Sequence, residues 1–123
     1  MNSSTPQSLF VRFSGDGDAF VATLDAPSIN QREAEIIGAS IEEAMTDLGG
    51  FKWFVVDMGQ VNFMSSMGIG MLIDVRSRAA GRKMKLILAN VTKELEQLLK
   101  MVKLDKVLVI CTNEKQLKKA LKR

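Results

Sequence analysis

The stretch from residue 53 to residue 70 constrains the fold most, because it joins an apolar run to a polar turn and a glycine-bearing segment. The run Trp53-Phe54-Val55-Val56 ends at Asp57, which is typical of a strand covered on both faces. A helix is predicted over residues 67–80, ended by Gly81. Either Ser65 or Ser66 can cap it, because a side-chain oxygen there can accept a hydrogen bond from a first-turn amide. We therefore expect the turn to present amides and a hydroxyl to solvent.

The N-terminal half predicts a hairpin followed by a helix. Apolar segments at residues 9–13 and 19–24 flank a predicted turn at Ser14-Gly15-Asp16-Gly17. Asn30 and Glu33 resemble a capping box, and the helix that they open is expected to run to about Leu48, before Gly49-Gly50. Its apolar side chains, spaced three or four residues apart, form one stripe that faces the core: Ala34, Ile37, Ile41, Ala44 and Leu48.

The C-terminal half continues the alternation of strands and helices. A strand is predicted over residues 83–89, a helix around residues 95–102, a strand over residues 107–111 and a terminal helix capped by Asn113. The expected order is ββαβαβαβα. It indicates a single α/β domain over residues 9–123, with a mixed, mostly parallel β-sheet and about four α-helices. Residues 1–8 are polar, include Pro6 and are expected to form a flexible N-terminal tail.

Length and composition favour one soluble domain. The chain has 123 residues, of which 46% are hydrophobic, so it can bury a single core without metal or disulfide support. No apolar run approaches the ~18 to 20 residues that cross a bilayer, and the N-terminus lacks the parts of a signal peptide. We expect a cytoplasmic protein with no direct membrane insertion. Cys111, the only cysteine, lies in an apolar run and is predicted to be a buried, inert thiol.

The chemistry-bearing residues argue against an enzyme. The chain has no histidine, which removes the commonest general base and metal ligand. The sequence around the two serines is not the Gly-x-Ser-x-Gly of a nucleophile elbow. No P-loop and no Gly-x-Gly-x-x-Gly follows a strand, so nucleotide-cofactor binding has no support. We therefore expect no catalytic residue, no cofactor and no metal.

Charge is unevenly distributed along the chain. The net charge is +3, with 3 basic and 9 acidic residues up to residue 60 and 14 basic and 5 acidic residues after it. The C-terminal lysines fit the solvated face of an end helix at least as well as a nucleic-acid surface. No aromatic residue alternates with them as a stacking platform requires, so no nucleic-acid partner is expected.

The segment Val61-Asn62-Phe63-Met64-Ser65-Ser66-Met67-Gly68-Ile69-Gly70 resembles the signature of STAS domains, the family named for sulfate transporters and anti-sigma factor antagonists. In bacterial antagonists the motif reads roughly hydrophobic-x-Phe-hydrophobic-Asp-Ser-Ser/Thr-Gly-hydrophobic-Gly, and a partner anti-sigma factor, itself a kinase, phosphorylates its serine. The resemblance places Ser66 on that acceptor, and Gly68 and Gly70 on the glycines. Leu24-Asp25-Ala26 resembles the family's Leu-Asp-Ala, in a loop beside the acceptor. The similarity covers about residues 9–122.

Two positions depart from the family pattern. Ser65 replaces the Asp before the acceptor, and Met67 replaces the small hydroxyl residue after it. The first change removes an anionic group and leaves three alternatives: a differently tuned kinase site, an acceptor shifted to Ser65, or a domain that is not phosphorylated. A purely capping Ser66 is a further interpretation.

The resemblance implies an anti-sigma factor antagonist that binds an anti-sigma factor with serine kinase activity and releases a sigma factor. Phosphorylation at Ser66 would switch it, and a phosphatase would be a further partner. The alternative is an accessory subunit of a lipid or anion transporter that is not phosphorylated. Met64, Met67 and Met71 form a stripe that is more often core than interface but that suits adaptable protein binding if exposed. The predicted contact surface comprises Asp25, Phe63, Met64, Ser65, Ser66, Met67, Gly68 and Met71.

Overall fold

A computed structural model describes residues 9–123, and the tail expected over residues 1–8 lies outside the described residues. The main sheet has the order β1-β2-β4-β6-β7. Only the β1–β2 pair is antiparallel, so the sheet is mixed and mostly parallel, as the sequence predicts. Its strands are β1 (Val11–Asp16), β2 (Ala19–Leu24), β4 (Trp53–Asp57), β6 (Lys85–Ala89) and β7 (Val109–Ile110).

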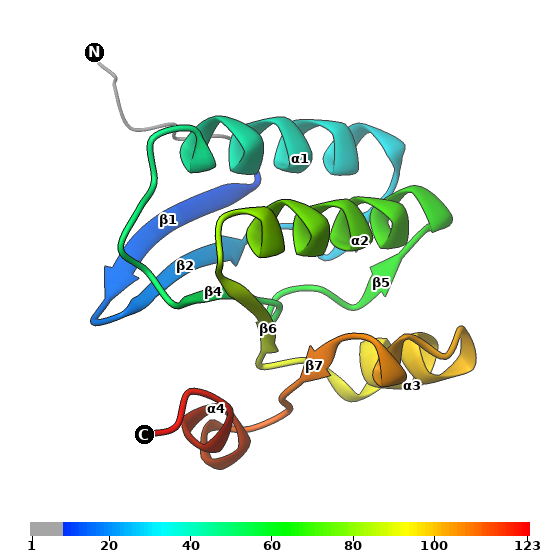
Figure 1. The fold of residues 1–123 in the computed structure, drawn as a ribbon. Helices are drawn as coiled ribbons and strands as arrows, with labels where there is room; N and C mark the ends of the chain where they lie inside the picture. Colours follow the sequence, from blue (N-terminus) through cyan, green and yellow to red (C-terminus); the bar gives the residue numbers. More distant parts are fainter. Residues whose placement is uncertain (1–8) are drawn as a thin grey trace.

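Four helices accompany this sheet: α1 (Gln31–Met45), α2 (Ser66–Gly81), α3 (Lys93–Met101) and α4 (Glu114–Ala120). A single turn of 3-10 helix, η1 (Leu104–Lys106), precedes β7. The ribbon shows α1 and α2 side by side on one face of the sheet and α4 on the other (Figure 1). The helix count and the α/β class match the sequence prediction.

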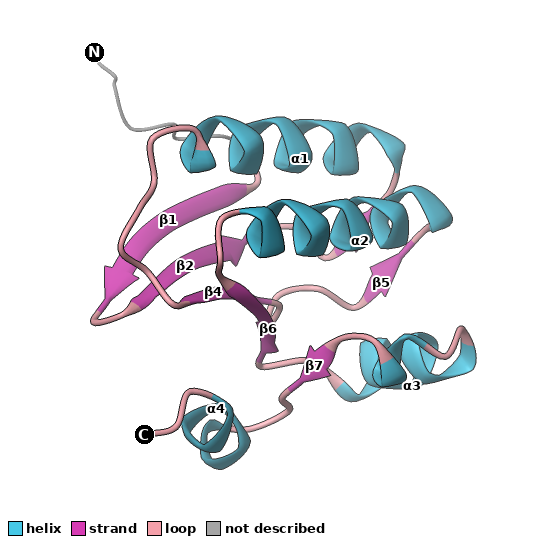
Figure 2. Ribbon diagram, viewed as in Figure 1, coloured by secondary structure: helices cyan, strands magenta, loops and turns pink. Residues whose placement is uncertain are grey.

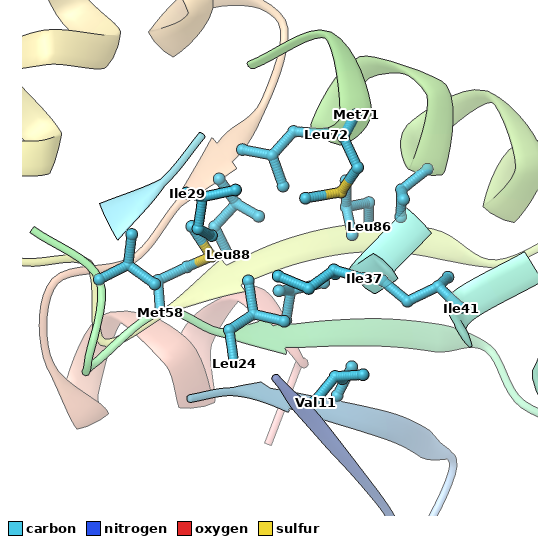
Figure 3. Close-up of a cluster of buried hydrophobic side chains, with 14 of the residues drawn as sticks. Val11, Leu24, Ile29, Ile37, Ile41, Met58, Met71, Leu72, Leu86 and Leu88 are labelled. Atoms are coloured by element: carbon cyan, nitrogen blue, oxygen red, sulfur yellow. The ribbon is translucent and has the colours of Figure 1, made fainter. Parts of the chain in front are cut away.

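The core has one part on each face of β4, as expected of a strand whose first four residues are apolar. Phe54 and Val56 point into the larger cluster, beneath α1 and α2. Trp53 and Val55 belong to the smaller cluster, which Leu117 and Leu121 cover from the other side. Figure 3 shows ten labelled members of the larger cluster, from strands, helices and loops: Val11, Leu24, Ile29, Ile37, Ile41, Met58, Met71, Leu72, Leu86 and Leu88.

The turn of the first hairpin lies further along the chain than predicted. The β1–β2 ladder continues from Val11 opposite Leu24 to Asp16 opposite Ala19, so the segment 14–16 is strand and not turn. Only two residues are left to connect the strands, and Gly17 adopts a φ of 61° there. A two-residue hairpin turn needs such a conformation, which glycine adopts without strain.

The boundaries of α1 agree with the prediction at the start and differ at the end. The Asn30 amide donates to the Glu33 carboxylate at 3.0 Å, which confirms that part of the predicted capping box. The helix ends at Met45 rather than near Leu48. The backbone amide of Thr46 donates a hydrogen bond to the Glu43 carbonyl, which tightens the last turn, and the Thr46 hydroxyl donates to the Glu42 carbonyl.

Two short strands, absent from the predicted order, form a separate parallel pair, of which Figure 2 labels β5. They are β3 (Ser28–Ile29) and β5 (Phe63–Met64). Two residues carry no alternating pattern, so only the meeting of these distant segments defines them.

The last two sheet strands are shorter than predicted. β6 begins at Lys85 and not at residue 83, because Lys83 has a φ of 62° and the Met84 amide still bonds to Ala79 at the end of α2. β7 spans only two residues, because the amides of Val107 and Leu108 bond back to the carbonyl of Leu104.

Among the described residues, no helix combines the length and the apolar character needed to cross a membrane.

Candidate functional site

The serine turn connects β5 to α2, and the loop that follows β2 holds it in place. The carbonyl of Pro27 accepts from the amides of Asn62 and Phe63, at 2.9 and 3.2 Å. The carbonyl of Ile29 accepts from the Ser65 amide at 2.9 Å. The loop after Leu24 therefore lies beside the serine turn, in agreement with what the family resemblance implies.

The two serines have different roles at the start of α2. Ser65 is the N-cap: its Oγ accepts from the Gly68 amide at 3.4 Å and donates to the Ile29 carbonyl at 3.3 Å. Ser66 is the first helical residue, is exposed, and makes no side-chain hydrogen bond to the described residues. The interpretation of Ser66 as the cap is therefore wrong, because the extended backbone of Ser65 brings its own side chain to the first-turn amides.

Gly68 is required by a close approach between α2 and β3. A Cβ at this position would lie 2.8 Å from the carbonyl oxygen of Ile29 and 3.2 Å from the terminal methyl of Met64. Gly70 has no such constraint, because a Cβ there would meet nothing within 4 Å. Of the two motif glycines, Gly68 is thus required for packing, whereas Gly70 is not.

The three methionines of the motif do not form one surface. Met64 and Met71 are buried, with 1% and 8% exposure, and belong to the main core. In contrast, Met67 of α2 is 48% exposed and Phe63 of β5 is 47% exposed. The accessible members of the predicted contact surface are Asp25, Phe63, Ser66 and Met67, with Ser65 partly accessible. Met64, Gly68 and Met71 instead support this surface from below.

A shallow groove of about 290 Å³ lies between α1 and α2, next to Ser66. Its lining includes Ala34, Glu35 and Gly38 of α1, none of which the sequence singled out as a site residue. The nearest signal in the sequence is Gly38 itself, a helix-weakening residue in the middle of α1 whose missing side chain leaves room for Met71. The side of the groove formed by α2 consists of Ser66, Met67, Gly70, Met71 and Asp74.

The two acidic residues singled out at strand ends have local partners. Arg12 binds Asp25 through two hydrogen bonds of 2.7 and 3.2 Å, and this contact lowers the pKa of the Asp25 carboxyl. Among the described residues, no hydrogen bond or ion pair joins Asp25 to the serine turn. Asp57 accepts hydrogen bonds from the Gly59 backbone amide and from the Asn90 side chain.

The geometry defines a class of site. An exposed hydroxyl stands at the positive end of a 16-residue helix, beside two exposed apolar side chains. Within the described part of the chain, no three His, Cys, Asp or Glu side chains are grouped so that they could hold a metal ion. Such an arrangement suits protein binding and modification of the hydroxyl.

Comparison with known proteins identifies the family. The sequence profile of the STAS domain matches residues 4–117, so this chain belongs to the STAS domain family. No curated protein matches the sequence. The match covers both the serine turn and the Leu24-Asp25-Ala26 segment.

Solved structures share the fold at low sequence identity. A STAS domain protein from Planctomyces limnophilus, described as an anti-sigma factor antagonist, has a TM-score of 0.78 and 18% identity, covering 92% of this chain and 98% of its own. The anti-sigma factor antagonist SpoIIAA of Bacillus, in its unphosphorylated form, has a TM-score of 0.70 and 17% identity, covering 92% and 97%. The murine anion transporter Slc26a9 has a TM-score of 0.64 and 19% identity, covering 72% of this chain and 14% of its own.

Proposed function

We propose that this STAS domain is an anti-sigma factor antagonist, which binds an anti-sigma factor with serine kinase activity and thereby releases a sigma factor. The observation that carries the proposal is the exposed hydroxyl of Ser66 at the start of α2, which makes no side-chain hydrogen bond within residues 9–123. Two anti-sigma factor antagonists among the structural neighbours cover nearly the whole chain, which supports the same class of function. Phosphorylation of Ser66 is the proposed switch.

The hydrogen bonds of the turn favour Ser66 over Ser65 as the acceptor. A phosphate on Ser65 would remove the cap of α2 and would bring negative charge against the Ile29 carbonyl oxygen. A phosphate on Ser66 breaks no side-chain hydrogen bond among the residues that the structure describes. It would carry about −1.5 to −2 charges at the positive end of the helix dipole, where an anion is typically worth ~0.3 to 1 kcal/mol in favour of the helix. The phosphorylated domain therefore stays folded.

Release of the partner then follows from the contact surface and not from unfolding. Phe63 and Met67 are exposed and apolar, and they flank Ser66 on the chain. A partner that fits these side chains and a neutral hydroxyl must desolvate a dianion after phosphorylation. A mismatch of about 2 to 3 kcal/mol lowers the affinity roughly 30- to 150-fold.

The experiment starts with affinity purification of the tagged protein from its own cells, followed by purification of the anti-sigma factor that it captures. Mass spectrometry after incubation with this kinase and ATP should find phosphate on Ser66. Ser66→Asp should weaken binding strongly at nearly unchanged thermal stability, and Ser66→Ala should keep binding but accept no phosphate. Phosphate on Ser65 alone would assign the phosphorylation site to Ser65 instead of Ser66. Phosphate on neither serine would refute the proposed phosphorylation switch.

A second pair of variants tests the contact surface. Met67→Asp places a charge in an apolar contact and should weaken binding by a few kcal/mol at most. Met101→Asp is the matched control, because Met101 is 80% exposed and lies at the end of α3. Equal effects of the two variants would place the interface elsewhere.

The second candidate function is that of an accessory subunit of a lipid or anion transporter, in which Ser66 is not phosphorylated. The similarity to Slc26a9 and to a sulfate transporter family protein of Wolinella succinogenes favours it. The neighbouring gene distinguishes the two candidates: an ATPase-like anti-sigma factor supports the first, and a transporter operon supports the second.

A further inference from the structure

A cavity of about 550 Å³ lies at the opposite end of α2 from Ser66. It is bounded by the C-terminal half of α2, by residues at the start of β4 and β6, by Val107 and Val109 around the start of β7, and by Lys122 after α4. Its size is within the range of about 300 to 1,000 Å³ that is common for small-molecule sites.

The charged side chains that line this cavity are all positive: Lys52, Arg76, Lys83, Lys85 and Lys122. Within residues 9–123, none of these five forms an ion pair. A concave surface with charges of one sign concentrates the electrostatic potential and attracts counter-ions. The cavity therefore lacks the negative charge that would balance it.

Stabilisation of the end of α2 does not account for these cations. Lysines near a helix C-terminus often interact with its last carbonyls. Here the carbonyls of Ala79 and Ala80 accept from the backbone amides of Arg82, Lys83 and Met84. The side chain of Arg82 instead donates to the Thr46 carbonyl and is not among the residues that line the cavity. The cavity cations thus remain available for a ligand.

The rest of the lining is apolar. Trp53, Met84 and Leu86 are buried, and Val107 is 45% exposed. Because β7 pairs with β6 only at Ile87 and Leu88, it leaves the first two residues of β6 without a strand partner on that side. The cavity thus combines cationic groups with an apolar wall along an incompletely covered sheet edge.

We propose that this cavity binds a phosphate ester that carries an apolar group next to its phosphate. The lysines and Arg76 hold the phosphate, since ammonium and guanidinium groups form strong charge-assisted hydrogen bonds with it. The apolar group lies on Val107 and Val109. The ligand is either a soluble ester or the headgroup region of an anionic lipid, and the site is independent of the Ser66 surface.

The chain contains its own reporter for this site. Trp53 is the only tryptophan, the chain has no tyrosine, and Trp53 lines the cavity. Tryptophan fluorescence and the amide NMR shifts of β6 are measured while the protein is titrated with hexyl phosphate or with inorganic phosphate at constant ionic strength. Saturable binding is expected, with hexyl phosphate at least about tenfold tighter because of its apolar chain.

Two double variants with equal change in charge test where the ligand binds. Lys83→Glu with Lys85→Glu reverses two cavity cations and should weaken hexyl phosphate binding by at least about 30-fold. Lys115→Glu with Lys118→Glu is the control, because these exposed lysines do not line the cavity. It should change the affinity by less than about threefold. Circular dichroism verifies that both variants are folded.

Vesicles distinguish the two sources of the ligand. Binding is measured to vesicles that contain phosphatidylglycerol, with vesicles of phosphatidylcholine alone as a blank. If the cavity variant loses vesicle binding and the control variant keeps it, the ligand is a lipid headgroup. Saturable binding of hexyl phosphate without vesicle binding assigns a soluble ester. If neither probe binds, or if both double variants weaken binding equally, the proposal is overturned.

Discussion

Gly68 packs against Ile29 so closely that a Cβ on Gly68 would lie 2.8 Å from the Ile29 carbonyl oxygen. That same oxygen accepts from the Ser65 amide and from the Ser65 hydroxyl. The contact therefore connects the loop after β2, the N-cap and the first turn of α2. It fixes the position from which Ser66 faces solvent.

The first prediction concerns this contact. Gly68→Ala should lower the free energy of unfolding by about 1 to 3 kcal/mol, since the added methyl overpacks the site against backbone. Gly70→Ala is the matched control, since its methyl meets open space in the same helix. It should raise stability by about 0.5 to 1 kcal/mol. Urea unfolding of both variants checks the prediction, and equal effects would mean that α2 does not approach β3 in this way.

The second prediction separates the two serines by stability alone. Ser65→Ala removes the N-cap and should cost about 0.5 to 2 kcal/mol. Ser66→Ala removes an exposed hydroxyl that makes no hydrogen bond to the described part of the chain, so its stability should stay within about 0.5 kcal/mol of that of the unmodified protein. Urea unfolding again gives the comparison. A larger loss for Ser66→Ala would reverse the assignment of the cap.

The third prediction concerns the contact between Arg123 and the β1–β2 hairpin. Arg123 donates to the carboxylates of Asp16 and Asp18, each at 3.0 Å, and its hydrogen bond is the main reason that the pKa of Asp18 is lowered. Because the pKa of Asp18 is lowered on folding, its ionised form stabilises the folded state at pH values above the unfolded-state pKa of about 3.9. This contribution is lost as the pH falls through the folded-state pKa.

Arg123→Ala should therefore raise the pKa of Asp18 and remove this part of the acid dependence. Because the pair is exposed, the effect on stability at neutral pH should be small. NMR titration of the Asp18 carboxyl carbon gives the measurement. Arg78→Ala is the control, since Arg78 pairs with Asp74 and Glu42 and should leave Asp18 unchanged. An unchanged Asp18 in Arg123→Ala would contradict the contact.

The fourth prediction concerns Cys111. The thiol is 2% exposed, and burial raises its pKa, so little thiolate forms at neutral or mildly alkaline pH. A thiol reagent such as dithionitrobenzoate should react with the native protein far more slowly than with the protein in concentrated urea. Equal rates in the two conditions would show that the smaller core cluster opens readily.

Much of the candidate site depended on a short motif that the sequence displays. The motif marks the turn between β5 and α2, and two of its apolar residues, Phe63 and Met67, are exposed there. The periodicity could not separate them from Met64 and Met71, because β5 and the first turn of α2 follow each other within two residues and change the direction of successive side chains. The α1 side of the groove carried no motif and was missed.

The sequence by itself determined the features that depend on neighbouring residues: the both-sided burial of β4, the capping interaction of Asn30 with Glu33, and the alternation that yields a mostly parallel sheet. Only the tertiary structure decided the features in which distant segments of the chain meet. Three such features are the pairing of β3 with β5, the hydrogen bond from the Ser65 hydroxyl to the Ile29 carbonyl, and the grouping of five cations in one cavity. Local propensity and spacing carry no information about such contacts, because packing of the whole chain sets their distances.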